Sequence, residues 1–220
     1  MKQYLYEIHA HTSDVSPCAH VKPEKVVEFY QNEGYDGIVI TDHMSPVVFK
    51  RMAGEPWQIK VDYFLSGYRK ALSHAHPGFS VLPGMELCFI NDSNDYLVYG
   101  FDEDFLYRHE DLTNMNLRQF RKIADDNGLL IFQAHPFRKN MRVVEPRLLD
   151  GIEVYNGNSS HNSNNDIAIL WADKYGLLKI SGSDFHRFFG MRPGGLYFPY
   201  SIKTNAELVE ALRSKEYKIR

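Results

Sequence analysis

Ten histidines occur in the chain, and imidazole is the side chain most often used for metal binding and for proton transfer near neutral pH. Several of these histidines directly follow short apolar runs and stand beside carboxylates. The polar residues that share this placement are His9, His11, Asp42, His43, Glu86, His135, Asn156, Asp184 and His186. Their positions predict a site for metal ions or proton transfer, built from segments that are distant in the sequence.

The spacing inside two of these segments favours metal binding. In His9-Ala10-His11 the imidazoles at i and i+2 project to the same side of an extended chain, so both can bind one ion. Asp184 and His186 repeat this arrangement. The imidazoles and carboxylates together exceed the needs of one tetrahedral ion, and a bridging Glu86 would let neighbouring ions share a ligand. We therefore predict two or three divalent ions.

The elements that must position these residues are indicated by alternating patterns. Apolar runs predict strands at 4–8, 37–40, 80–82, 96–99, 129–132, 151–155 and 178–180. Helical patterns between them predict helices at about 23–34, 61–73, 116–126, 166–175 and 206–214. This alternation favours an α/β fold with parallel strands. In a barrel of such strands the carboxyl ends lie on one face, which would bring the polar residues together.

The chain shows no sign of a second domain. Its 220 residues, 44% of them hydrophobic, suit one globular unit with a sizeable core. No repeat, low-complexity tract or linker interrupts the pattern, and the longest irregular stretch, Met44 to Lys60, is expected to be a loop over one barrel face. We expect residues 1–220 to form a single domain.

Charge and cysteine content narrow the partners and the compartment. A net charge of -3 gives no general attraction to nucleic acid or anionic lipid, so neither is expected as an obligatory partner. The stretch from Met1 to Ile8 lacks the apolar core of a signal peptide, and no run has the length of a membrane span. The only cysteines, Cys18 and Cys88, form no CxxC pair. These features favour a reducing, cytoplasmic location.

Taken in order, the motifs around the polar residues resemble a known family. They read His9-Ala10-His11-Thr12, Gly34-Tyr35-Asp36-Gly37, Ile40-Thr41-Asp42-His43, Gly84-Met85-Glu86, Ala134-His135-Pro136, Ile152-Glu153-Val154-Tyr155-Asn156 and Gly182-Ser183-Asp184-Phe185-His186. This series resembles the PHP domain, named for polymerase and histidinol phosphatase. The resemblance covers nearly the whole chain, and it implies a distorted (β/α)7 TIM-like barrel with up to three ions, usually zinc, manganese or iron. It also implies hydrolysis of phosphate esters.

The resemblance further implies how the ligands are shared. The ligands of one ion would be His9, His11, Glu86 and Asp184. Glu86 and His135 would belong to a second ion, and His20, His43 and His186 to a third. Two positions depart from the family pattern. Either Asp102 or His161 would complete the second site, and Asp14 competes with His20 for the loop ligand.

The implied reaction is attack on a small phosphomonoester, as in histidinol phosphatases, by a metal-bound hydroxide near Glu86. His186 or Asp42 would protonate the leaving alkoxide. Arg138 and Arg187 stand where guanidinium groups could clamp phosphate oxygens, although a surface salt bridge would also explain each of them. The expected partner is a small phosphorylated substrate, and neither its identity nor the oligomeric state is fixed by the sequence.

Two other functions compete with this interpretation. A metal-dependent amidohydrolase would also use a barrel and a histidine-rich site, but such enzymes usually add a bridging lysine, and no lysine occupies a predicted strand end. A non-catalytic regulatory module would be expected to have lost ligands, and the ligand set here is nearly complete. Both alternatives therefore rank below a phosphoesterase.

Overall fold

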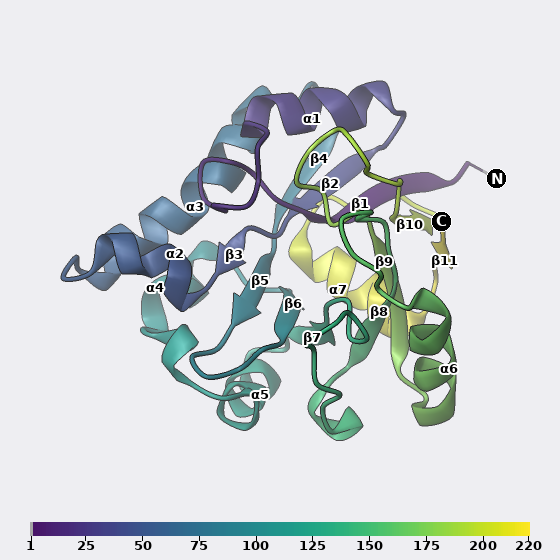
Figure 1. Cartoon of the computed structure of the whole chain (residues 1–220). Helices are drawn as coiled ribbons and strands as arrows, with labels where there is room; N and C mark the ends of the chain where they lie inside the picture. The colour runs from purple at the N-terminus through teal and green to yellow at the C-terminus, as the bar shows by residue number, and fades with distance from the viewer. Residues whose placement is uncertain (1) are drawn as a thin grey trace.

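The computed structural model describes residues 2–220, along which strands and helices alternate (Figure 1). The strands are β1 (Tyr4–Ala10), β2 (Gly37–Ile40), β3 (His43–Met44), β4 (Ser80–Pro83), β5 (Met85–Cys88), β6 (Asp95–Tyr99), β7 (Leu130–Gln133), β8 (Gly151–Asn156), β9 (Leu178–Gly182), β10 (Leu196–Phe198) and β11 (Lys218–Ile219). The helices are α1 (Pro23–Asn32), α2 (Pro46–Phe49), α3 (Trp57–His74), α4 (Glu103–Arg108), α5 (Leu117–Asp126), α6 (Asn165–Tyr175) and α7 (Asn205–Ser214). Short 3-10 turns lie at Lys50–Met52, Leu112–Asn114 and Pro146–Leu148.

The predicted α/β class is confirmed, but the prediction that all the strands are parallel is wrong. One sheet has the order β11-β10-β1-β2-β4, and the other has the order β3-β5-β6-β7-β8-β9. Strand β6 pairs antiparallel with both β5 and β7, and β10 pairs antiparallel with β1. Only a short link joins β5 to β6, and a parallel crossover needs a dozen or more residues, so this pair must be antiparallel.

The hydrogen-bonded strands of residues 2–220 form these two sheets and no single closed ring of seven strands. The two sheets are nevertheless joined by short connections, since β2 is followed directly by β3 and β4 directly by β5. The amide of Gly84 donates to the carbonyl of Ile40 at 2.8 Å, and the amide of Glu86 donates to the carbonyl of Asp42 at 3.1 Å. This continued pairing places Glu86 directly opposite His43 across β5 and β3, so the turn between the sheets positions two of the expected ligands.

All of the predicted helices are present, and local signals mark the start of three of them. Pro23 occupies the first turn of α1, where its missing N–H costs nothing. Helices α5 and α7 each begin with a capping box, from Asn116 with Gln119 and from Thr204 with Glu207. Figure 1 shows α1 and α3 side by side over β2 and β4, and α6 beside β8 and β9. These helices leave one end of the strands open.

The stretch from Met44 to Lys60 is not the loop that was expected. It contains α2, a 3-10 turn and the first residues of α3. The Ser45 side chain caps α2 by accepting a hydrogen bond from the amide of Val48. Short helices of this kind have too few periodic positions to be recognised from apolar spacing.

The interior beneath the open end of the strands is mainly apolar. Large buried side chains there include Tyr6, Tyr99 and Phe132. The Tyr99 hydroxyl donates to the carbonyl of Ile8 at 2.8 Å, which satisfies a polar group that would otherwise be costly to bury. None of the helices in residues 2–220 has the length and apolar character needed to cross a membrane.

Candidate metal centre

Four buried side chains converge where β1, β5 and β9 meet. His9 Nε2 lies 3.4 Å from Glu86 Oε1 and 3.5 Å from Asp184 Oδ1. His11 Nε2 lies 3.3 Å from Glu86 Oε2 and 3.4 Å from Asp184 Oδ1. All four side chains are at most 2% exposed. The ligand set that the resemblance implied for one ion is therefore brought together.

The polar atoms of this group fit a bound cation. Buried atoms without a hydrogen-bond partner include His9 Nε2, His11 Nε2, Glu86 Oε2 and Asp184 Oδ1. Leaving such an atom unpaired costs roughly 1–3 kcal/mol, and more when the group is charged. Because the Glu153 carboxylate accepts from His9 Nδ1 at 2.8 Å, the lone pair of a neutral His9 points from Nε2 toward two carboxylates. A divalent cation between these groups would satisfy all of them.

A second cluster contains Glu86, Asp95 and His135. His135 Nε2 lies 3.1 Å from Glu86 Oε1 and 3.9 Å from Asp95 Oδ2. Glu86 thus belongs to two clusters, as a bridging ligand would. Asp95 was not among the predicted ligands, because it precedes an apolar run and does not follow one. Since β6 is antiparallel to its neighbours, the start of this strand lies at the site.

The two residues proposed to complete the second site lie in different places. Asp102 follows the other end of β6, where its carboxylate caps α4 by accepting from the amide of Phe105 at 2.7 Å. His161 lies at the site, with Nε2 4.0 Å from Asp184 Oδ2 and its ring centroid 5.7 Å from that of His135. Its Nε2 is buried without a hydrogen-bond partner, so His161 remains available as a ligand and Asp102 does not.

We expect Asp95→Asn to weaken binding of one ion by ~10-fold or more, because a neutral amide replaces a charged oxygen ligand. Asp102→Asn is the matched control. Asparagine caps helices about as well as aspartate, so metal binding and stability should both stay unchanged. Isothermal titration of the two metal-free variants measures metal binding, and thermal unfolding measures stability. Weaker metal binding in Asp102→Asn but not in Asp95→Asn would contradict the assignment.

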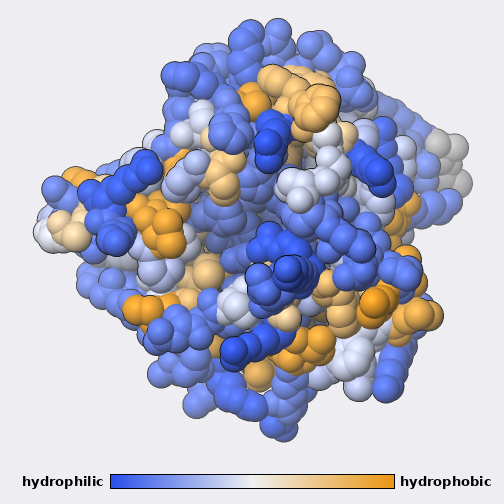
Figure 2. Space-filling view, viewed as in Figure 1, coloured by the Kyte–Doolittle hydropathy of each residue, from blue (hydrophilic) through white to orange (hydrophobic). Residues whose placement is uncertain are grey.

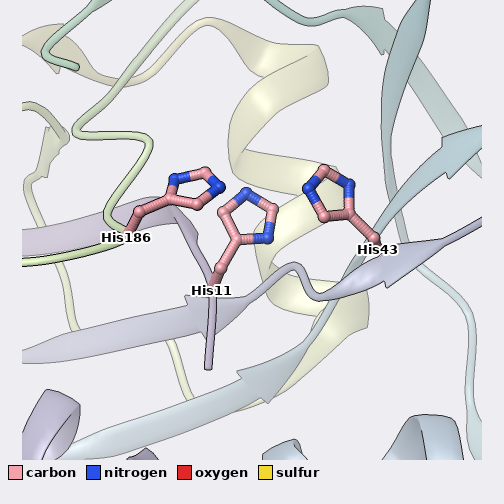
Figure 3. A group of neighbouring side chains, drawn as sticks. All are labelled: His11, His43 and His186. Atoms are coloured by element: carbon pink, nitrogen blue, oxygen red, sulfur yellow. The ribbon is translucent and has the colours of Figure 1, made fainter. Parts of the chain in front are cut away.

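A third cluster contains His11, His43 and His186. Figure 3 shows the His11 ring between the other two, with centroid separations of 4.5 Å to His43 and 4.4 Å to His186. His43 Nδ1 also lies 3.0 Å from Glu86 Oε2. The three rings come from the ends of β1 and β9 and from β3, so all three chain segments meet at this edge of the site.

The structure does not bring the expected loop residue to this cluster. His20 is exposed and lies in none of the three clusters found among the described residues. Asp14 accepts from Lys70 Nζ at 3.2 Å instead. The side chain that reaches the histidines is Cys18, whose Sγ lies 3.2 Å from His43 Nε2 and 3.1 Å from His186 Nε2. Sequence reasoning passed over Cys18 because it forms no CxxC pair.

Asp42 organises the loop before the site. Its carboxylate accepts at 2.6 Å from the amide and the hydroxyl of Thr12 and from the hydroxyl of Ser16. Burial raises the pKa of Asp42 to about 6, against the opposing effect of these hydrogen bonds. Asp42 is not among the side chains that line the cavity over the site. The structure therefore does not bring this expected proton donor to the position where a substrate would lie.

The electrostatics of the site couple ion binding to protons. Burial lowers the pKa of His43, but Glu86 and Cys18 together outweigh it and raise this pKa well above its ordinary value. Burial likewise raises the pKa of Glu86, while His43 and His9 outweigh it and bring this pKa well below the usual range. A proton on His43 therefore competes with a bound ion, whereas burial and the neighbouring His186 and His43 bring the pKa of His11 well below its ordinary value. Metal affinity should therefore fall as the pH falls.

A second layer of buried groups orients the ligands. Glu153 accepts from His9 Nδ1, from the amide of His135 at 2.9 Å and from the Asn156 side chain at 2.9 Å. The same Asn156 amide donates to Asp184 Oδ2 at 3.2 Å. His135 and Asp184 both have left-handed backbone conformations, with φ of 29° and 49°. Strain of this kind persists where the surroundings over-determine the conformation, as these hydrogen bonds do.

A cavity of about 330 Å³ opens over the three clusters. Besides the ligands, its lining includes Arg138, Arg187, Asn158, Ser160 and His161. Arg138 Nη2 lies 3.4 Å from Asp95 Oδ2, and Arg187 is exposed at the rim. Figure 2 shows that hydrophilic residues dominate the middle of this face. Both arginines are therefore placed beside the site, as expected.

Comparison with known proteins supports the fold. No model of a protein family and no curated protein sequence matches the chain. Among solved structures, a two-domain protein from Bacteroides vulgatus described as containing a predicted PHP-like metal-dependent phosphoesterase matches 100% of this chain and 65% of its own, with TM-score 0.68 and 16% identity. PsfC from Pseudomonas syringae matches 95% of this chain and 88% of its own, with TM-score 0.70 and 15% identity.

A third solved structure bears on the alternative function. It is an amidohydrolase from Chromobacterium violaceum with bound sulfate and no metal, and it matches 94% of this chain and 96% of its own. Its TM-score is 0.58 and its identity is 16%. Identities this low show the fold rather than the reaction. The chain therefore has the fold of the PHP-like metal-dependent phosphoesterases, as the resemblance of its motifs implied.

Proposed function

We propose that this chain is a metal-dependent phosphoesterase that hydrolyses a small phosphomonoester. The observation that carries the proposal is the position of Glu86, shared by two ligand clusters beneath a cavity that two arginines line. Bound divalent ions would neutralise phosphate oxygens and lower the pKa of a bound water. Zinc, manganese and iron all accept the imidazole and carboxylate ligands found here.

Other residues of the chain would bind the phosphate group and donate a proton. Arg138 and Arg187 would bind the phosphate oxygens through their guanidinium groups, which complement such oxygens in pairs. Asp95 holds Arg138 toward the ligands. The cavity volume lies at the small end of the range for ligand pockets, which favours a compact substrate. Of the two expected proton donors, His186 lines the cavity and Asp42 does not.

Two features weigh against the competing functions. No lysine lines the cavity among the residues that the structure describes, whereas the amidohydrolase alternative would favour one. A regulatory module would have no need to keep buried ligand atoms without hydrogen-bond partners, since these destabilise the fold when no ion is bound. The structural similarity to one amidohydrolase keeps that alternative in the test.

The test is a panel of phosphomonoesters run beside amides and lactones, on protein loaded with zinc, manganese or iron. We expect hydrolysis of phosphomonoesters only, lost on removal of the ions by a chelator, and more than one equivalent of metal by elemental analysis. Hydrolysis of amides or lactones alone would replace the proposal with the amidohydrolase. Less than one ion per chain after reconstitution would reject the multi-metal centre.

We also propose that residues 2–220 form one domain whose two sheets together make a distorted (β/α)7 barrel. A parallel bridge between Ala10 and Phe185 joins the end of β1 to the segment after β9, and β2 and β4 lead directly into β3 and β5. One domain should unfold in one cooperative transition. Two separate transitions by circular dichroism and fluorescence would contradict this proposal.

A further inference from the structure

Cys18 lies between two imidazoles that are already oriented by other groups. His186 Nδ1 donates to the carbonyl of Asp184 at 3.0 Å, and His43 Nδ1 lies 3.0 Å from Glu86 Oε2. In the neutral rings the lone pair is therefore on Nε2, and both Nε2 atoms face Cys18 Sγ at 3.2 and 3.1 Å. A thiol has one proton and can satisfy only one of these two lone pairs.

The position of Cys18 is fixed by the fold. Ser16 donates its hydroxyl proton to Asp42 at 2.6 Å and accepts from the amide of His43 at 3.0 Å. On the other side of Cys18, the amide of Ala19 donates to the carbonyl of Ser16 at 3.0 Å, and the amide of His20 donates to the carbonyl of His186 at 2.8 Å. The loop is thus tied to both histidine-bearing segments, and it holds the sulfur between them.

The fully buried His11, whose Nε2 faces Glu86 and Asp184, also brings its ring against this pair of imidazoles. Its ring lies between those of His43 and His186, and its Nε2 has no hydrogen-bond partner. The three imidazoles have ring nitrogens within 4.8 Å of one another, which is close enough for neighbouring rings to bind one ion.

We propose that Cys18, His43 and His186 form an outer metal site in which the Cys18 thiolate is a ligand. This proposal deepens the metal-dependent function proposed above, and it gives the thiolate the place that the resemblance had assigned to His20. Binding breaks the S–H bond and releases the proton to solvent, and a sulfur–metal bond forms. His186 then binds an ion through Nε2 and is not free to protonate a leaving group.

The donor atoms predict which ions this outer site prefers. The group of His9, His11, Glu86 and Asp184 offers nitrogen and oxygen, and Glu86, Asp95 and His135 offer mainly oxygen. Only the outer site includes sulfur, which favours zinc and cobalt over the harder manganese and magnesium. Three protein ligands and an exposed side leave a fourth position open, as in catalytic zinc sites. The centre would therefore hold different metals at different positions.

Cobalt binding tests this proposal without turnover. Titration of the metal-free chain with Co²⁺ should produce a thiolate-to-cobalt charge-transfer band in the near ultraviolet, which zinc abolishes and manganese does not. Cys18→Ser should lose the band and bind about one ion fewer per chain. Cys88→Ser, which changes the other cysteine, and His20→Ala, which changes the exposed histidine of the same loop, should keep it.

Each other outcome rejects a defined part of the proposal. A band that survives in Cys18→Ser, or that is absent from both the unmodified chain and Cys88→Ser, excludes Cys18 as a ligand. Loss of about one bound ion in His20→Ala, with no loss in Cys18→Ser, would return the third position to His20. Displacement by manganese would reject the preference for soft ions. A band without phosphomonoester hydrolysis would reject the proposed function and leave the outer site standing, and hydrolysis without a band would do the reverse.

Discussion

Replacement of Glu86 by glutamine is expected to remove two ions and to lower the phosphatase rate by at least ~100-fold. The carboxylate oxygens of Glu86 face His9 and His135 through Oε1 and His11 and His43 through Oε2. Glutamine keeps the size of the side chain but removes the negative charge that offsets both cations. Its amide would also turn donor hydrogens toward imidazoles or ions. One substitution should therefore empty both clusters that share this residue.

Elemental analysis, circular dichroism and the hydrolysis rate together test this prediction. The fold should survive, because the core beneath the site is apolar and does not depend on Glu86. Glu33→Gln is a suitable control, since this glutamate is exposed at the end of α1 and should change neither metal content nor rate. If Glu86→Gln keeps full metal occupancy and a near-normal rate, Glu86 does not bridge two ions.

Most of the fold could be predicted because its signals are local. Each predicted strand and helix overlaps an observed one, since apolar runs and capping residues act within a few positions of the chain. The two clusters that share Glu86 are here called the inner clusters, and most of their ligands could also be predicted. His9 lies near the end of β1, and His11, His135 and Asp184 come just after strands that end on the same face, so their convergence required only that those strands run in the same direction.

The misses have a common physical cause, because each depends on contacts that are distant in sequence. Asp95 comes to the site because β6 is antiparallel, and strand direction is set by pairing with β5 and β7. Cys18 comes to the site because Asp42 and His186 tie its loop in place. Asp42 was expected at the cavity but lies under this loop. Adjacency to His43 in sequence did not reveal that the two side chains face different ways.

Glu153 was recognised only as part of a motif, yet its replacement should have the second-largest effect. It is 1% exposed and belongs to none of the three clusters found in the described part of the chain. Through His9 Nδ1 and the amide of His135 it contacts one ligand of each inner cluster. We expect Glu153→Gln to weaken metal binding by ~10- to 100-fold, the range for groups that orient metal ligands. The loss should involve both inner ions.

The reason lies in the tautomer of His9. An ionised Glu153 can only accept, so it holds the proton on Nδ1 and keeps Nε2 free to bind, whereas a glutamine can instead donate to Nδ1 and move the proton to Nε2. Glu7→Gln is the matched control, because Glu7 is equally buried but accepts its hydrogen bonds from backbone amides, among them those of His9 and Ser183, and from the Ser183 hydroxyl, rather than from an imidazole. It should change stability more than metal affinity. Equal losses of metal affinity in both variants, measured by titration with zinc, would show that burial of a charge near β1 matters and that orientation of His9 does not.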